Sequence, residues 1–188
     1  MMILLRAGLL ALALAAPAAA EGLFPLVKGG PYSLTDQHGQ TRTQADPDGH
    51  AQLLFFGYAN CPGICSAAMP LMADVVDAVG AAGHSLRPVM ITVDPARDTV
   101  ETMAPAMTTF HRDFIGLTGP QTALDSAYAA FNVDHQWVYD DPEYGPVYSH
   151  GSLIYLMDAQ GTVLTVLPPV LDAARATQIT LKYLGAQG

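Results

Sequence analysis

A near-continuous apolar run, residues 51–58, ends shortly before the only two cysteines of the chain, Cys61 and Cys65. Such a run is typical of a strand buried on both faces of a sheet, which requires covering layers on either side. Apolar residues at helical spacing from Met69 to Val79 predict that a helix follows. Thiolates are favoured at the N-terminus of a helix. The pattern therefore predicts an α/β fold with a redox or soft-metal site at this junction.

Strands and helices alternate along the rest of the chain. A leading β-hairpin is expected around the turn at residues 36–39, and residues 98–101 have the form of a capping box, led by Asp98, that opens a helix. The order β-α-β-α-β-α followed by β-β-α matches a thioredoxin-like central mixed β-sheet with an insertion, flanked by helices on both faces. Further strands are predicted at 86–93, 114–117, 133–139, 152–157 and 162–167, and helices at 98–110, 121–131 and 171–184.

The first 20 residues resemble a secretory signal peptide. Arg6 supplies a positive charge, residues 7–16 an apolar stretch, and residues 18–20 a small-residue cleavage site. We therefore expect cleavage of residues 1–20, a single domain over residues 21–188 and a periplasmic location. An uncleaved membrane anchor is the less favoured alternative, because the apolar stretch is far shorter than the roughly 20 residues of a spanning helix.

Acidic residues outnumber basic ones, and the formal net charge is −9. Such a surface repels phosphate groups, so nucleic acids and anionic membranes are not expected as partners. The acidic segment at residues 140–143 is either a docking patch or, more commonly for such a run, a solvated loop. In the segment 94–99, we expect Arg97 to pair with a carboxylate and hold its loop.

The residues alone leave three interpretations of the cysteine pair open. A structural disulfide would contribute only about 2 kcal/mol for so short a loop, so stabilisation is a weak reason for the pair. Reversible redox chemistry is possible, although three residues separate the thiols, where ordinary thiol oxidoreductases of this fold have two. Two thiolates with a third ligand suit Cu(I), whereas a closed zinc site needs four protein ligands.

A third ligand would come from a histidine, and His150 is the strongest candidate. It alone lies just before a predicted central strand, at a segment that passes over the cysteine loop in a thioredoxin-like sheet. A histidine in this place is otherwise a loop or capping residue. The histidines considered are His38, His50, His84, His111, His135 and His150.

Three segments resemble the Sco/SenC family of copper-binding cytochrome c oxidase assembly proteins. The resemblance implies a thioredoxin-like fold and Cu(I) or Cu(II) held by Cys61, Cys65 and His150. It also implies delivery of copper to the CuA-bearing subunit of cytochrome c oxidase, or of electrons to the cysteines of that site. Other periplasmic copper chaperones or thiol reductants are the further partners expected. The segments are residues 55–65, 92–99 and 148–150.

The chain departs from the family pattern at three positions beside the expected ligands. Gly63 and Ser149 stand where the family usually has Asp, and Ser66 stands where it usually has Pro. The two missing carboxylates remove negative charge beside the metal. We expect this to affect Cu(II) affinity and partner contacts more than the Cu(I) ligand set.

A thiol-disulfide reductase is the alternative function, so the sequence leaves open whether the protein is an enzyme. Reductases of this fold usually carry a cis-proline near the slot that Ser152 occupies, and no proline occurs at residues 149–158. This favours metal binding over general reduction. A thiol peroxidase is weaker still, because residues 60–63 do not supply the surroundings that its cysteine requires.

Overall fold

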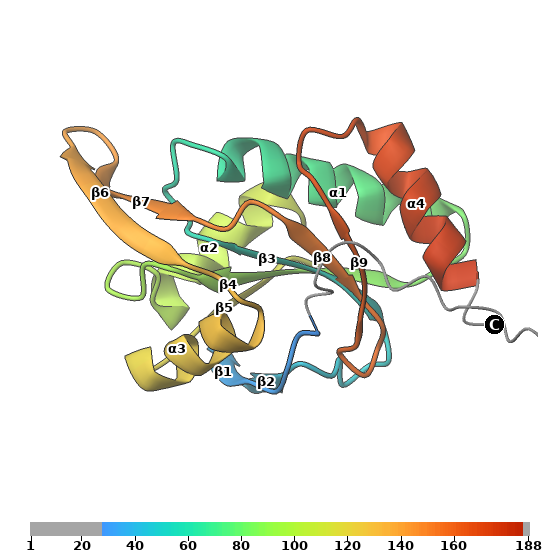
Figure 1. Cartoon of the computed structure of the whole chain (residues 1–188), viewed down its shortest axis with the longest axis horizontal. Helices are drawn as coiled ribbons and strands as arrows, with labels where there is room; N and C mark the ends of the chain where they lie inside the picture. The colour runs from blue at the N-terminus through green and yellow to red at the C-terminus, as the bar shows by residue number, and fades with distance from the viewer. Residues whose placement is uncertain (1–27, 186–188) are drawn as a thin grey trace, which may run out of the picture.

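The computed structural model describes residues 28–185, so the predicted signal peptide lies outside the described residues. Over this range a seven-stranded sheet, in the order β2-β1-β5-β4-β3-β8-β9, packs against four helices (Figure 1). The predicted mixed sheet flanked by helices is confirmed. The elements are β1 (Ser33–Asp36), β2 (Thr41–Thr43), β3 (Ala51–Gly57), α1 (Cys65–Ala81), β4 (Leu86–Thr92), α2 (Val100–Phe110), β5 (Ile115–Thr118), α3 (Gln121–Ala130), β6 (His135–Asp141), β7 (Gly145–His150), β8 (Ile154–Met157), β9 (Val163–Leu167) and α4 (Ala173–Gly185).

The apolar run at residues 51–58 forms β3, at the centre of the sheet. β3 pairs in parallel with β4 and antiparallel with β8. Successive side chains point to opposite faces, so Leu53 and Phe55 pack into one core cluster while Leu54 and Phe56 pack into the other. Burial on both faces explains why the run lacks polar alternation.

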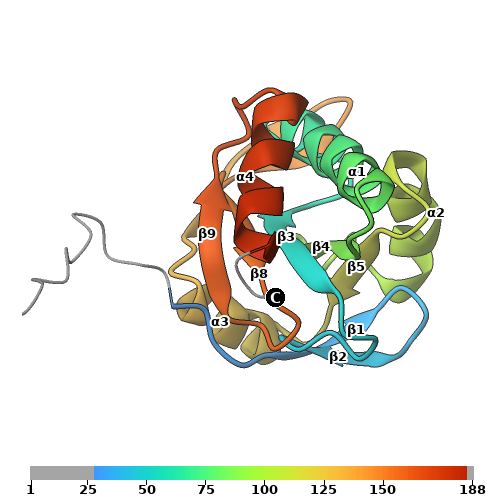
Figure 2. The same cartoon turned by 90° about the vertical axis from the view of Figure 1, so that its right-hand side faces the viewer.

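Helices cover both faces of the sheet, as predicted. α1, α2 and α4 pack on one face and α3 packs on the other (Figure 2). α1 begins earlier than its apolar spacing indicates, with Cys65 as its first residue. The second cysteine therefore belongs to the first turn of the helix and is placed by it.

The predicted N-terminal hairpin is confirmed as β1 and β2, which form one edge of the main sheet next to β5. The buried Asp36 closes the turn between them. Its carboxylate accepts hydrogen bonds from the backbone of His38 and Gln40 and from Nε of Arg42, the last at 2.7 Å. One carboxylate thus accepts from two backbone amides of the turn and from one side chain of β2.

The strand predicted at residues 133–139 does not join the main sheet. It forms β6, which pairs with β7 in a separate hairpin that projects from the body of the molecule (Figure 1). Trp137 and Val138 are consecutive rather than alternating apolar residues, and the pairing register shifts between Trp137 and Tyr139. The strand therefore lacks the single apolar face that a sheet could bury. The sequence predicted an insertion without locating it, and this hairpin, between α3 and β8, is an addition to the main sheet.

Candidate metal centre

Both sulfurs lie at the junction of β3 and α1. Cys61 is half-buried in the loop, Cys65 is fully buried, and both thiols are free. Gly57 makes room for them at the end of β3. A Cβ at this position would lie 3.0 Å from the Cys65 Sγ and 2.7 Å from the Phe55 ring. The strand ends in glycine because the Cys65 sulfur packs against its backbone.

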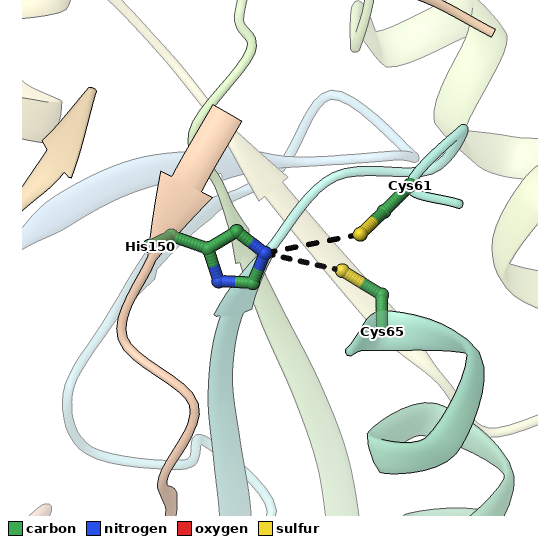
Figure 3. A group of neighbouring side chains, drawn as sticks. All are labelled: Cys61, Cys65 and His150. Atoms are coloured by element: carbon green, nitrogen blue, oxygen red, sulfur yellow. Dashed lines mark hydrogen bonds between the residues drawn. The ribbon is translucent and has the colours of Figure 1, made fainter. Parts of the chain in front are cut away.

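His150 ends β7, and its imidazole points at both sulfurs (Figure 3). Its Nε2 lies 3.8 Å from the Cys61 Sγ and 3.4 Å from the Cys65 Sγ. The three possible donor atoms all lie within 4.8 Å of one another. The structure therefore brings together the three residues that were predicted as metal ligands; that they bind a metal stays a prediction.

A second group of possible ligands, Asp46, Asp48 and His50, lies elsewhere. Arg87 fills it. The guanidinium pairs with Asp46 at 3.2 Å and Asp48 at 3.0 Å, and it lies 2.7 Å from the His50 Nδ1. Because the Arg87 guanidinium already contacts all three of these side chains, the cysteine site is the stronger candidate for a metal centre.

The His150 ring is held in one orientation. Its Nδ1 lies 3.0 Å from the carbonyl oxygen of Gly151. Since a carbonyl only accepts, Nδ1 carries the proton and Nε2 turns its lone pair toward the sulfurs. Phe55 and Tyr58 pack edge-on against the ring, with centroids 5.7 Å and 5.8 Å away. Sequence reasoning did not assign these neighbours to the site.

The two thiols differ in acidity. A hydrogen bond from the Cys65 thiol lowers the pKa of Cys61 to about 4, and hydrogen bonds from the Cys65 and Gly63 backbone act in the same direction against burial. The same Cys65–Cys61 hydrogen bond, together with burial, raises the pKa of Cys65. Cys61 therefore loses its proton first, and the remaining proton is shared between the sulfurs.

We expect iodoacetamide to modify Cys61 well before Cys65 in the reduced, metal-free protein at about pH 6, below the ordinary thiol pKa of about 8.5. The thiolate is the reactive form, and Cys61 is also the more exposed sulfur. Peptide mass spectrometry with fragmentation locates the label. In Cys65→Ala the reaction at Cys61 should slow at this pH, because its main hydrogen-bond donor is gone. Equal labelling of both cysteines would contradict this assignment.

Arg97, in the loop after β4, connects this loop to the hairpin that carries His150. As predicted, Arg97 pairs with a carboxylate, that of Asp94. It also donates hydrogen bonds to the backbone carbonyls of Tyr144 and Pro146 in the hairpin, the latter at 2.8 Å. These contacts fix the hairpin whose last residue is His150.

Gly145 allows this close approach. It sits in the turn of the hairpin with φ of +74°, and a Cβ there would lie 2.5 Å from the Arg97 Nη1. Only glycine fits both the backbone conformation and the guanidinium. The Arg97 guanidinium also lies over the Tyr58 ring, 5.8 Å from its centroid, so it contacts the aromatic wall of the site as well.

Asp98 ties the same loop to the cysteine segment. Its buried carboxylate accepts hydrogen bonds from the Thr92 hydroxyl at 2.6 Å and the Ala59 backbone at 3.1 Å. The predicted capping box led by Asp98 is therefore wrong. Thr99 caps α2 instead and exchanges hydrogen bonds with Thr102, because the Asp98 carboxylate is committed to the interior.

Two of the three departures from the family pattern, Gly63 and Ser149, leave the two sulfurs and the imidazole without a carboxylate beside them. A Cβ on Gly63 would lie 3.8 Å from the Cys61 Sγ, an ordinary contact, so the site has space for a side chain there. The Ser66 hydroxyl donates to the Gly63 carbonyl at 2.6 Å. Ser149 lies on the exposed side of β7, 3.5 Å from the carbonyl of Gln136. Two sulfurs and one imidazole nitrogen are a soft set that suits a monovalent metal such as Cu(I).

The sequence of the chain matches the SCO1/SenC family model over residues 21–185. It is 34% identical over 139 residues to the SCO2-like protein of Rickettsia conorii, a match that covers 72% of this chain and 67% of the relative. It is 32% identical over 138 residues to the human mitochondrial protein SCO1 homolog, covering 72% of this chain and 46% of the relative.

Solved structures agree in fold. ScoI of Arabidopsis thaliana with copper bound superposes with a TM-score of 0.79 at 27% identity, covering 84% of this chain and 98% of that one. ScoI of Bradyrhizobium japonicum with copper bound superposes with a TM-score of 0.72 at 28% identity, covering 83% of this chain and 99% of that one. The thioredoxin-like fold is confirmed. The chain belongs to the SCO1/SenC family.

Proposed function

We propose that this protein is an exported copper carrier that holds one copper ion with Cys61, Cys65 and His150 and delivers it to the CuA site of cytochrome c oxidase. The observation that carries the proposal is the placement of the His150 Nε2 within 4 Å of both sulfurs, with its lone pair toward them. The copper-bound relatives from Arabidopsis and Bradyrhizobium support the choice of metal. Copper is the cargo of this site.

A copper-transfer assay tests the proposal. The Cu(I)-loaded protein is mixed with the reduced, metal-free CuA-bearing domain of the oxidase, the two are separated, and copper is measured in each. We expect copper to move to the domain from the wild type, whereas Cys65→Ser should carry little copper at the start. Oxidase activity in a deletion strain, restored by the wild type and not by Cys65→Ser, checks the same role in the cell. Normal oxidase activity without the protein would contradict it.

Thiol-disulfide reduction of the CuA-site cysteines is the second candidate, and the lowered pKa of the half-buried Cys61 favours it. The Cys61 thiolate would attack the target disulfide and release one target thiolate. Cys65 would then displace the second, leaving a Cys61–Cys65 disulfide and a target reduced by two electrons. His150→Ala separates the two functions, because it removes a copper donor and keeps both thiols. Loss of oxidase assembly in this variant supports the carrier, whereas normal assembly supports the reductase.

The proposed location is the periplasm. No helix within residues 28–185 is long and apolar enough to cross a membrane. Mass spectrometry of the protein from a periplasmic fraction tests the location and the cleavage before Glu21 together. Recovery from the membrane fraction with residues 1–20 intact would support the anchored alternative instead.

We expect Gly63→Asp to strengthen Cu(II) binding relative to Cu(I). The structure has space for the side chain beside the Cys61 Sγ, and a carboxylate adds negative charge and a hard oxygen donor, which the divalent ion prefers. Titration of each oxidation state measures the ratio of affinities. Gly63→Asn is the matched control, because it adds a side chain of the same shape without the charge. An equal change in both variants would contradict the electrostatic explanation.

A further inference from the structure

The β6–β7 hairpin carries most of the large apolar side chains that the described residues expose. Of the five such side chains at residues 28–185, four lie on it: Trp137, Val138, Tyr139 and Tyr144, with exposed fractions of 58%, 50%, 48% and 41%. We call these four the hairpin patch. Single exposed apolar residues are ordinary, whereas a cluster of this kind marks an interaction surface. The fifth, Val170, lies apart from them between β9 and α4.

The hairpin patch reaches the candidate metal site through one of its residues, Tyr139. A groove of about 330 Å³ is lined by Tyr139 and Val147 of the hairpin, by Ile64 of the cysteine loop, and by Cys61 and His150 themselves. Residues 53–67 include no Asp, Glu, Lys or Arg. An apolar surface therefore extends from the exposed hairpin to two of the proposed ligands.

The charge around the patch has one sign. Residues 132–151 include four acids and no Lys or Arg. The nearby Arg97 is already engaged by Asp94 and by the hairpin carbonyls. A second copy of the chain would bring like charges together, and an anionic membrane would be repelled. A partner with basic residues around an apolar contact fits this surface.

The conformation of the hairpin is fixed by contacts with the body of the protein. Arg97 fixes its turn through two carbonyls, and the bulge between Trp137 and Tyr139 exposes three successive apolar residues. A rigid surface loses less conformational entropy on association than a mobile loop.

We propose that the hairpin patch is the docking surface for the copper acceptor, a protein that presents an apolar contact surrounded by Lys and Arg. The inference rests on the proposed function, because copper transfer defines the partner. It adds that recognition is made by the hairpin, through apolar contact at its centre and acidic side chains at its rim.

The apolar part is tested with Trp137→Ser/Val138→Ser, and Val170→Ser is the matched control for loss of an exposed apolar side chain. The probe is the reduced, metal-free CuA-bearing domain. NMR titration gives the affinity of the complex, and stopped flow gives the rate of Cu(I) transfer below saturation. We expect the hairpin variant to bind the domain about tenfold more weakly and to transfer Cu(I) about tenfold more slowly. Its own affinity for Cu(I) should be unchanged, and the control should behave as wild type.

The acidic part is tested with Asp140→Asn/Glu143→Gln. The matched control, Asp74→Asn/Asp125→Asn, removes the same charge from exposed positions on α1 and α3. We expect the hairpin variant to bind several-fold more weakly at low salt and to lose much of the salt dependence of association. The control should keep that dependence.

The outcomes separate docking from function. If the wild type binds the domain through the patch but no copper moves, docking stands and the carrier function fails. If copper moves equally from all variants, the function stands and docking by the hairpin is overturned. Absence of wild-type binding overturns docking of this acceptor. Docking of the acceptor is also overturned if Trp137 is required for self-association in sedimentation, which would make a second copy of the chain the partner. Binding to anionic vesicles that requires Trp137 would overturn it in favour of a membrane.

Discussion

His150→Ala is expected to weaken Cu(I) binding by roughly a hundredfold or more, since loss of even an outer neighbour of a metal ligand typically costs about 10- to 100-fold. The change removes the nitrogen that lies 3.4 Å from the Cys65 sulfur and leaves two sulfur donors. Because the ring is half-buried, the fold should persist. Competition with a chromophoric Cu(I) chelator measures the affinity, and circular dichroism checks the fold.

The hairpin offers a matched control in His135→Ala. His135 lies directly across the hairpin from His150, and its ring packs on Tyr128 with centroids 4.5 Å apart. Its loss removes an imidazole from the same hairpin without removing a donor from the site, so Cu(I) affinity should stay close to wild type. Cys61→Ser and Cys65→Ser should weaken binding as strongly as His150→Ala. Wild-type affinity in His150→Ala would eliminate the three-ligand site.

The central part of the fold was predictable because its burial leaves a plain pattern in the sequence. β3 is buried on both faces, and its apolar run shows this directly. α1 packs one side on the sheet, so its apolar residues follow helical spacing. The pairing of β6 with β7 was not predictable in the same way. β7 includes Gly145 and Pro146, which usually argue against a strand, and its partner exposes both faces.

The candidate metal site was also predictable only in part. The thiols were evident from their position after β3, and His150 was the strongest third candidate from its position before a predicted central strand, to which the resemblance also pointed. The contacts that orient these side chains were not evident, because many of them use backbone atoms: the Gly151 carbonyl on the imidazole, the Ala59 amide on Asp98, and the hairpin carbonyls on Arg97. A backbone group has no residue identity, so a sequence pattern cannot report it. Asp98 shows that a residue type can also mislead. Aspartate commonly caps a helix, but the Asp98 carboxylate binds the Thr92 hydroxyl and the Ala59 amide instead.

Arg97→Met is expected to weaken Cu(I) binding by about tenfold, within the range measured for residues that orient metal ligands. Methionine keeps the length of the aliphatic stem and loses the guanidinium that holds the Tyr144 and Pro146 carbonyls. The hairpin should then sample positions in which His150 lies farther from the sulfurs. Hydrogen exchange of the β6–β7 amides should become faster. The free energy of unfolding should fall by about 1–3 kcal/mol, because charge-assisted hydrogen bonds are lost.

A double-mutant cycle with His150→Ala shows whether Arg97 acts through the histidine. If it does, Arg97→Met has almost no further effect on Cu(I) affinity once the imidazole is gone, since there is no donor left to position. Arg112→Met is the matched control, because Arg112 is 87% exposed and lies in the turn after α2. Arg97→Lys should recover only part of the affinity, since an ammonium cannot reproduce the planar fork that reaches two carbonyls. Additive losses in the cycle would show that Arg97 acts on the cysteines or on the whole fold instead.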